Sequence, residues 1–150
     1  MAENISILND LIETSRDGEK GFLAAADDTK NPELKEIFQK RAEDCAKGAA
    51  QLLELVVRSG GNPEEGGTLA GAVHRGWLNL KAAVSARNDL AILEECERGE
   101  DVAKAKYRKA LEDSSLSAEE RDVVQRQYNG VMRNHDQIRA LRDQYRGAKT

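Results

Sequence analysis

Apolar residues recur every three or four positions through most of the chain, which is the period of an amphipathic α-helix. The first apolar stripe predicts a helix over about residues 5–28, and the second predicts one over 32–58. The stretch 31–33, Asn-Pro-Glu, supplies an N-cap, a proline at the first helical position and an acid in the first turn. Ser-Gly-Gly at 59–61 is a typical C-terminal stop signal.

Two further helices are predicted in the second half of the chain. One runs over about 88–112, and the other opens at a capping box, Ser117 with Glu120 three residues later, and continues to about Tyr145. Between the two halves, 62–67 (NPEEGG) reads as an irregular loop, and 68–86 reads as a shorter amphipathic helix.

The lengths of the connections predict how these helices pack. The first and third connections are short, so each flanking pair of helices should form an antiparallel hairpin. The middle connection is long and contains its own short helix. We therefore expect an all-α, ferritin-like four-helix bundle with a short extra helix in the central crossover, built as one domain over 1–150.

A weak internal repeat relates the two predicted hairpins. The stretch RDGEKGFLAAA aligns with ERGEDVAKAKY and superposes Gly18-Glu19 on Gly99-Glu100. The second helices also align in phase, with these pairs: Ile37 and Val123, Gln39 and Gln125, Leu52 and Ile138.

The glutamates that the repeat superposes are candidate ligands of a metal centre. A dimetal site in such a bundle takes carboxylates from two helices and a Glu-x-x-His motif from each of the other two. Glu19, Glu100 and His135 lie on the apolar stripes and match three of these ligands, and they would suit iron or manganese. Met132 stands where the glutamate of one motif is expected. The nearby acidic residues that could assist are Glu43, Asp44 and Glu97.

The same glutamates have a second interpretation that needs no metal. Buried carboxylates are costly without partners, and Arg41 lies close to the stripe of the second helix. A pair between Arg41 and a glutamate would leave a structural ion-pair network in place of a metal centre. Because half of the expected ligands are missing, we favour this degenerate site.

Glycines and cysteines inside the predicted helices complete the picture of the core. Gly18, Gly21, Gly48, Gly99 and Gly130 indicate close backbone approach or room for a side chain from across the bundle; the alternative is tolerated, exposed glycine. The two cysteines, Cys45 and Cys96, fall on apolar faces, so we expect reduced core residues and no disulfide.

The short central segment carries a distinctive cluster of His74, Arg75 and Trp77, the only tryptophan. Tryptophan and arginine are typical interface anchors, so these three residues are a candidate interaction surface. The alternative, which we favour, is that Trp77 fastens the crossover onto the bundle.

Composition narrows the function classes. Charged residues make up 33% of the chain and the net charge is −4, which gives no basic surface for nucleic acid. No apolar run approaches the ~20 residues of a membrane span, and the acidic N-terminus lacks a signal-peptide pattern. We expect a cytoplasmic protein that binds neither nucleic acid nor membrane.

Four stretches resemble a known family: LNDLIETSRDGEKGF, GGTLAGAVHRGWLNLKAAV, AILEECERGED and HDQIRALRDQY. They are similar to a bacterial, mainly proteobacterial, family of ferritin-like four-helix-bundle proteins of unknown function. The resemblance spans nearly the whole chain and implies a ferritin-like fold. It implies no activity.

The sequence does not decide whether the chain is an enzyme and favours a non-catalytic protein. Our leading hypothesis is a ferritin-like bundle with a degenerate metal site, acting as a stress-related or interaction protein that forms homo-oligomers. The alternative is an iron- or manganese-binding redox or storage protein that uses Glu19, Glu100 and His135.

Overall fold

A computed structural model describes residues 2–61 and 88–148 of the chain. These residues form four α-helices and no strand: α1 (Ala2–Asp28), α2 (Pro32–Arg58), α5 (Asp89–Glu112) and α6 (Ala118–Ala148). The all-α prediction is confirmed for this part of the chain. The outer limits were predicted too short, because α1 begins before Ile5 and α6 continues past Tyr145. The predicted short helix over 68–86 lies outside the described residues.

The residues that begin and end the helices make the local contacts expected of helix caps. Asn31 Oδ1 accepts hydrogen bonds from the backbone N–H groups of Glu33 and Leu34, at 2.8 and 3.3 Å, and so caps α2. Asn88 caps α5 in the same way. At the other end of α2, Gly60 takes a φ of +80°, which glycine adopts without the steric cost of a side chain.

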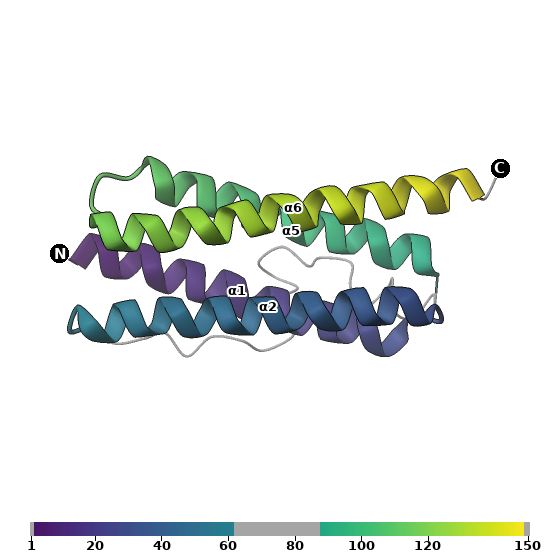
Figure 1. Ribbon diagram of the computed structural model, residues 1–150, viewed down its shortest axis with the longest axis horizontal. Coiled ribbons are helices and arrows are strands. Elements are labelled where there is room, and N and C mark those ends of the chain that lie inside the picture. The colour runs from purple at the N-terminus through teal and green to yellow at the C-terminus, as the bar shows by residue number, and fades with distance from the viewer. Residues whose placement is uncertain (1, 62–87, 149–150) are drawn as a thin grey trace.

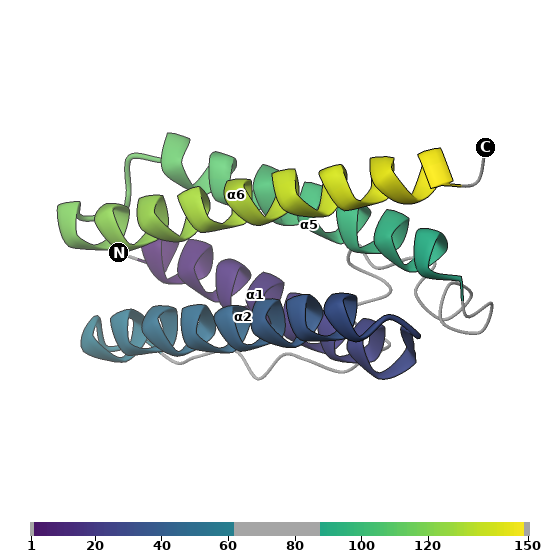
Figure 2. The same cartoon turned by 45° about the vertical axis from the view of Figure 1, so that its right-hand side comes forward.

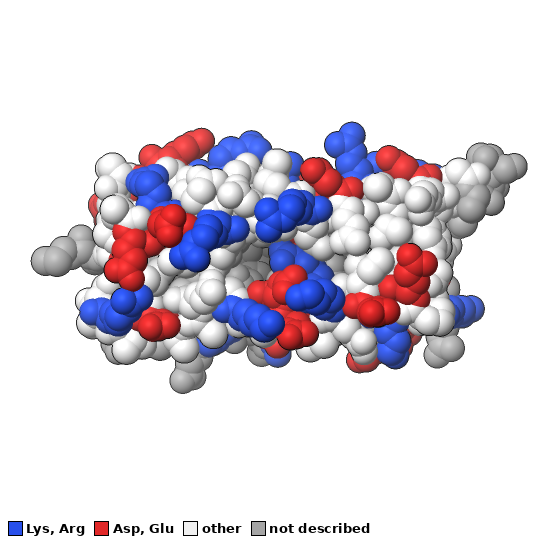
Figure 3. Space-filling model, viewed as in Figure 1, with Lys and Arg blue, Asp and Glu red and all other residues white. Residues whose placement is uncertain are grey.

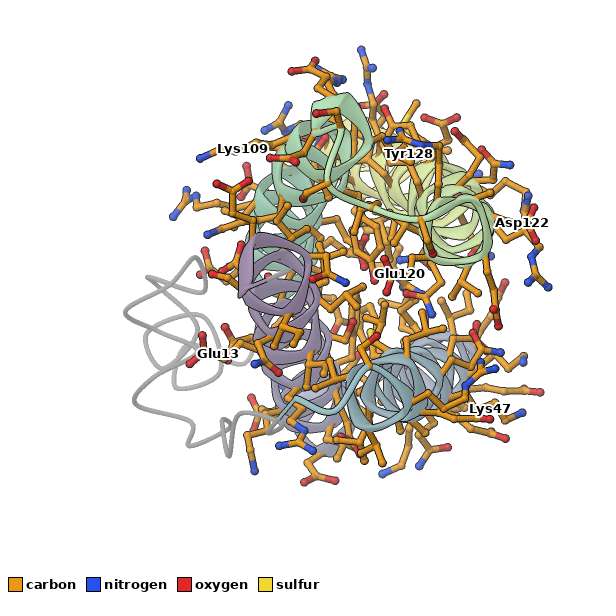
Figure 4. The ribbon with its side chains drawn as sticks, turned by 90° about the vertical axis from the view of Figure 1, so that its left-hand side faces the viewer. Glu13, Lys47, Lys109, Glu120, Asp122 and Tyr128 are labelled. Carbon is orange, nitrogen blue, oxygen red and sulfur yellow. The ribbon has the colours of Figure 1, made fainter. Side chains whose placement is uncertain are left out.

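The predicted capping box at the start of α6 is also present. Ser117 Oγ accepts from the Glu120 N–H at 3.1 Å, and Glu120 Oε1 accepts from the Ser117 N–H at 2.8 Å. The Glu120 carboxylate also accepts from Asn4 at the start of α1 and from Ser59 at the end of α2. Figure 4 shows Glu120 lying among the helices, whereas Lys47 projects outward from α2. One capping residue therefore joins three helix termini.

The helices form two antiparallel hairpins, α1 with α2 and α5 with α6 (Figure 1). Thr29 donates to Asp89 and Asn31 donates to Tyr145, so the end of α1, the starts of α2 and α5 and the end of α6 lie together. The second view shows the same arrangement (Figure 2). Consequently α2 and α5 run in the same direction, and the end of α2 and the start of α5 lie at opposite ends of the bundle.

Two groups of apolar side chains fill the bundle, one toward each end. The first is built around Phe22, Phe38 and Ile138, and the second around Leu8, Leu52 and Val124. None of the described helices is long and apolar enough to cross a membrane.

The internal repeat is reproduced in part in the burial of equivalent residues. Gly18 and Gly99 are both buried, and so are Leu52 and Ile138. Gln39 and its equivalent Gln125 are both exposed. The equivalence is close for α2 and α6 and incomplete for α1 and α5, where Glu19 is half-buried but Glu100 is buried.

Candidate functional site

The two hairpins diverge along one side of the bundle and leave a cavity there. Of the neighbouring helix pairs, α2 and α6 make the least extensive contact. A cavity of about 470 Å³ opens between them and is lined by residues of all four described helices. Figure 3 shows this side of the molecule, where a hollow is rimmed by basic and acidic side chains. The cavity lies between the two apolar clusters.

A buried ion pair forms one wall of the cavity. Arg41 of α2 donates to Glu100 of α5 through Nε and Nη2, at 2.9 and 3.4 Å. Asn134 of α6 donates to Oε1 of the same carboxylate at 3.0 Å. The side chains of Arg41 and Glu100 are only 11% and 2% exposed. Such burial is tolerable because both charges are compensated and hydrogen-bonded.

The surroundings of Arg41 keep its guanidinium charged. Burial by itself would lower the pKa of Arg41, but the neighbouring Cys45 and the Glu100 carboxylate outweigh it and raise the pKa. The guanidinium carbon also lies 5.9 Å from the centre of the Phe22 ring, a favourable cation–π distance. Arg41 is thus a fixed positive charge at the centre of the bundle.

A chain of hydrogen bonds forms the opposite part of the lining. Tyr107 Oη lies 3.2 Å from Ser15 Oγ and donates to Gln127 Oε1 at 2.7 Å. Gln127 in turn donates to the carbonyl oxygen of Gly48 at 3.2 Å. Burial raises the pKa of Tyr107 to about 12, so its hydroxyl is protonated at neutral pH.

Cys45 and Gly18 both line the cavity and approach each other closely. A β-carbon at Gly18 would lie 2.9 Å from Cys45 Sγ, so this glycine provides room for a side chain from the neighbouring helix. Burial raises the pKa of Cys45 to about 12, and Cys96 is buried as well. Both thiols are free, as predicted, and a thiol with such a pKa is a poor nucleophile at neutral pH.

The three predicted metal ligands occupy different environments. Glu100 lines the cavity, but both of its oxygens accept hydrogen bonds from Arg41 or Asn134. Glu19 is half-buried and is not part of the cavity lining. His135 is buried between α5 and α6, with Nε2 2.6 Å from Asp101 Oδ1. Its Nδ1 is buried and has no hydrogen-bond partner within the described residues.

The three predicted helper residues each have a basic partner. Asp44 lines the cavity and pairs with Lys40; Glu43 pairs with Lys47, and Glu97 pairs with Arg142. Within residues 2–61 and 88–148, no group of three or more histidine, cysteine or acidic side chains is placed to hold a metal ion. As placed here, the residues do not fit a metal centre, and metal binding by Glu19, Glu100 and His135 stays a prediction.

Sequence reasoning missed several polar residues of the site. Asn134 and Gln127 lie beside the apolar stripe of α6, where a polar residue ordinarily faces solvent, so periodicity carries no signal for them. Ser15 lies on the stripe of α1 and is buried, and a hydroxyl at such a position could have been noticed. The candidate interaction surface of His74, Arg75 and Trp77 lies outside the described residues.

The comparison with known families agrees with this picture of a helical protein without an assigned activity. Residues 3–113 of the 150 match the family described as Domain of unknown function (DUF2383), and the chain belongs to this family. The match covers α1 from Glu3 onward and all of α2 and α5, and it includes Arg41, Cys45 and Glu100. A search of curated proteins gives no match.

Proposed function

We propose that this protein is a non-catalytic helical bundle in which Arg41 neutralises Glu100 where a metal-binding bundle would hold a metal ion. One observation supports the proposal: a carboxylate only 2% exposed has both oxygens engaged by protein donors. A metal ligand must offer a free oxygen lone pair to the ion. A cation on Glu100 would either displace Arg41 or lie beside its buried guanidinium, and both arrangements are unfavourable because an unpaired buried charge is costly and like charges repel.

The chemistry of the cavity also favours binding over catalysis. Acid–base and nucleophilic catalysis need groups that titrate near the working pH. The pKa values of Cys45 and Tyr107 are both raised to about 12, far from neutrality. His135 is bonded to Asp101 and is not among the lining residues.

The proposal extends to the architecture and the assembly. The order of helix directions, with α2 and α5 parallel and each hairpin antiparallel, supports a ferritin-like connectivity. Homo-oligomerisation, a stress-related role and bacterial, cytoplasmic origin remain predictions of the sequence. Light scattering of the purified chain measures the oligomeric state directly.

Elemental analysis tests the proposed absence of a working metal site. Protein purified from cells supplemented with iron or manganese should contain far less than one metal ion per chain. Glu100→Gln should leave that content unchanged. Stoichiometric metal that is lost in Glu19→Ala, Glu100→Ala or His135→Ala would instead establish the alternative, an iron- or manganese-binding redox or storage protein.

Urea unfolding tests the structural role of the ion pair. Glu100→Gln removes the counterion of a buried guanidinium and should lower the free energy of unfolding by about 3–5 kcal/mol. Lys40→Gln, which breaks an exposed pair with Asp44, is the matched control and should change it by less than about 1 kcal/mol. Equal effects of the two substitutions would contradict the proposal.

A further inference from the structure

The acidic groups of the cavity are already committed to partners within the protein. Glu100 accepts three hydrogen bonds, two from Arg41 and one from Asn134. The remaining acidic residues of the lining have interactions as well: Asp44 with Lys40, Asp10 with Lys106, and Asp17 with a further group. These acidic side chains therefore already interact with groups of the protein, which leaves little negative charge in the cavity to attract a cation.

Two basic side chains of the lining, Arg41 and Arg133, still have N–H donors without an acceptor among the described residues. A guanidinium has five N–H donors, and Glu100 occupies only the edge formed by Nε and Nη2 of Arg41. Among the described residues, no acceptor occupies the other edge, between Nη1 and Nη2. This edge belongs to a side chain that lines the cavity and is 11% exposed. Its two parallel donors have the spacing that a second carboxylate recognises.

A second basic group lies on the α6 side of the cavity. Arg133 is exposed, lines the cavity and forms no ion pair with any described residue. On the α2 side, Lys47 is 65% exposed and has only a surface pair with Glu43 of its own helix, a contact that contributes little. Among the described lining residues, the cavity therefore offers free N–H donors on Arg41, whose charge Glu100 already balances, and a positive charge without an ion pair at Arg133.

The size and the remaining lining define the rest of the ligand. A volume of about 470 Å³ is in the range of small-molecule sites and exceeds what one carboxylate group fills. The lining offers the hydrogen-bonded Tyr107 and Gln127 together with short apolar side chains, Val102, Ala103 and Val131. A short carbon chain with charged ends matches this combination.

We propose that the cavity binds a small organic dicarboxylate, with one carboxylate on the free Nη1–Nη2 edge of Arg41 and the other near Arg133. The inference rests on the proposed non-catalytic function, because it needs Arg41 and Glu100 to remain paired while the ligand is bound. Binding would fill the space between α2 and α6 and draw these two helices together. The ligand would therefore stabilise the folded bundle in proportion to its occupancy.

Nuclear magnetic resonance of the full chain tests this directly, with succinate as the probe. Succinate should produce saturable shifts at the Arg41 Nε–H resonance and at the backbone amides of Gly48 and Gly130, which line the cavity. Succinamide has a similar shape and no charge, so it should produce none. Absence of saturable shifts with millimolar succinate, or equal shifts with succinamide, would overturn the proposal.

Substitutions locate the binding. Arg133→Gln should weaken succinate binding by about tenfold, the equivalent of losing one charge-assisted contact. Arg139→Gln removes the same charge from an exposed position of α6 outside the cavity lining, and it should have no effect. Equal weakening by both variants would show non-specific attraction and overturn the site. Arg41→Lys removes the two parallel N–H donors of the guanidinium and should abolish succinate binding. If this variant does not fold, the comparison of Arg133→Gln with Arg139→Gln still tests the site.

The two proposals can fail separately. The titrations use protein dialysed against a chelator, with its metal content measured. If metal-free protein does not bind succinate, the proposed dicarboxylate site is wrong, and the proposal of a non-catalytic bundle is unaffected. Stoichiometric metal in the protein as purified would overturn the proposed function, whatever the result with succinate.

Discussion

At the scale of single residues, the close approach of α1 and α2 depends on Gly18. Helix propensity alone would favour alanine over glycine by about 1 kcal/mol inside a helix. A β-carbon at Gly18 would nevertheless lie 2.9 Å from Cys45 Sγ, on a side chain that is itself buried. The packing requirement at this position therefore outweighs the propensity.

Gly18→Ala should accordingly be less stable than Gly130→Ala, with a difference of about 1–3 kcal/mol from overpacking. A β-carbon at Gly130 meets only a flexible arginine end at 3.8 Å, so this control should gain stability from helix propensity. Urea unfolding measures both variants. Adding Cys45→Ala removes the sulfur and should reduce the cost of Gly18→Ala. If the cost is the same in both backgrounds, the steric explanation is wrong.

At the scale of helices, the sequence specified the elements well. Capping residues act on backbone groups two or three positions away, so Asn31 and Ser117 could be recognised without any tertiary information. The outer ends of α1 and α6 were less predictable, because the apolar stripe fades there and the glycine near the end of α6, Gly147, lies within the helix. The repeat predicted equivalent faces for α2 and α6, because helix phase depends on spacing along the chain; in α1 and α5 the agreement is incomplete.

Glu120 is the helix-terminal residue with the largest expected effect. Glu120→Ala removes the capping box of α6 and the contacts to Asn4 and Ser59, and should cost about 1–3 kcal/mol. Glu119→Ala is the matched control, since its side chain is 64% exposed and pairs only with Arg58 at the surface. Hydrogen exchange should show faster opening of the first turn of α6 in the Glu120 variant alone. Equal exchange in the two variants would argue against Glu120 as the link.

At the scale of the whole molecule, the buried thiol and phenol predict how stability depends on pH. Burial raises the pKa of Cys45 from 9.0 to about 12 and that of Tyr107 from 10.0 to about 12. The folded state therefore keeps both protons where the unfolded state releases them. Their contribution is complete below about pH 9, and it should be lost progressively as the pH rises toward 12.

Urea unfolding at a series of pH values above neutrality measures this loss. Cys45→Ala and Tyr107→Phe each remove one titrating group, so each should flatten the decline, whatever its stability at neutral pH. The comparison therefore uses the slope with pH, not the absolute free energy. A stability that is constant across this window in the unmodified chain would contradict the assignment.

The residues of the candidate site could be predicted from the sequence only in part. The sequence predicted that Glu100 lies on an apolar stripe and that Arg41 could pair with a glutamate, without deciding which, and the structure pairs Arg41 with Glu100. It left the partner of Glu100 open between arginine and metal. The cavity itself was not predicted, because it arises from the divergence of α2 and α6, and helix packing angles depend on side chains of several helices at once.

The sequence by itself therefore determined the helices, their caps, their buried faces and the pairing into hairpins. All of these depend on interactions between residues close along the chain or on the lengths of connections. Only the tertiary structure decided that Arg41 and Asn134 converge on Glu100, that Cys45 occupies the space left by Gly18, and that a cavity remains beside them. These depend on the relative rotation and height of four helices, which only the packed core sets.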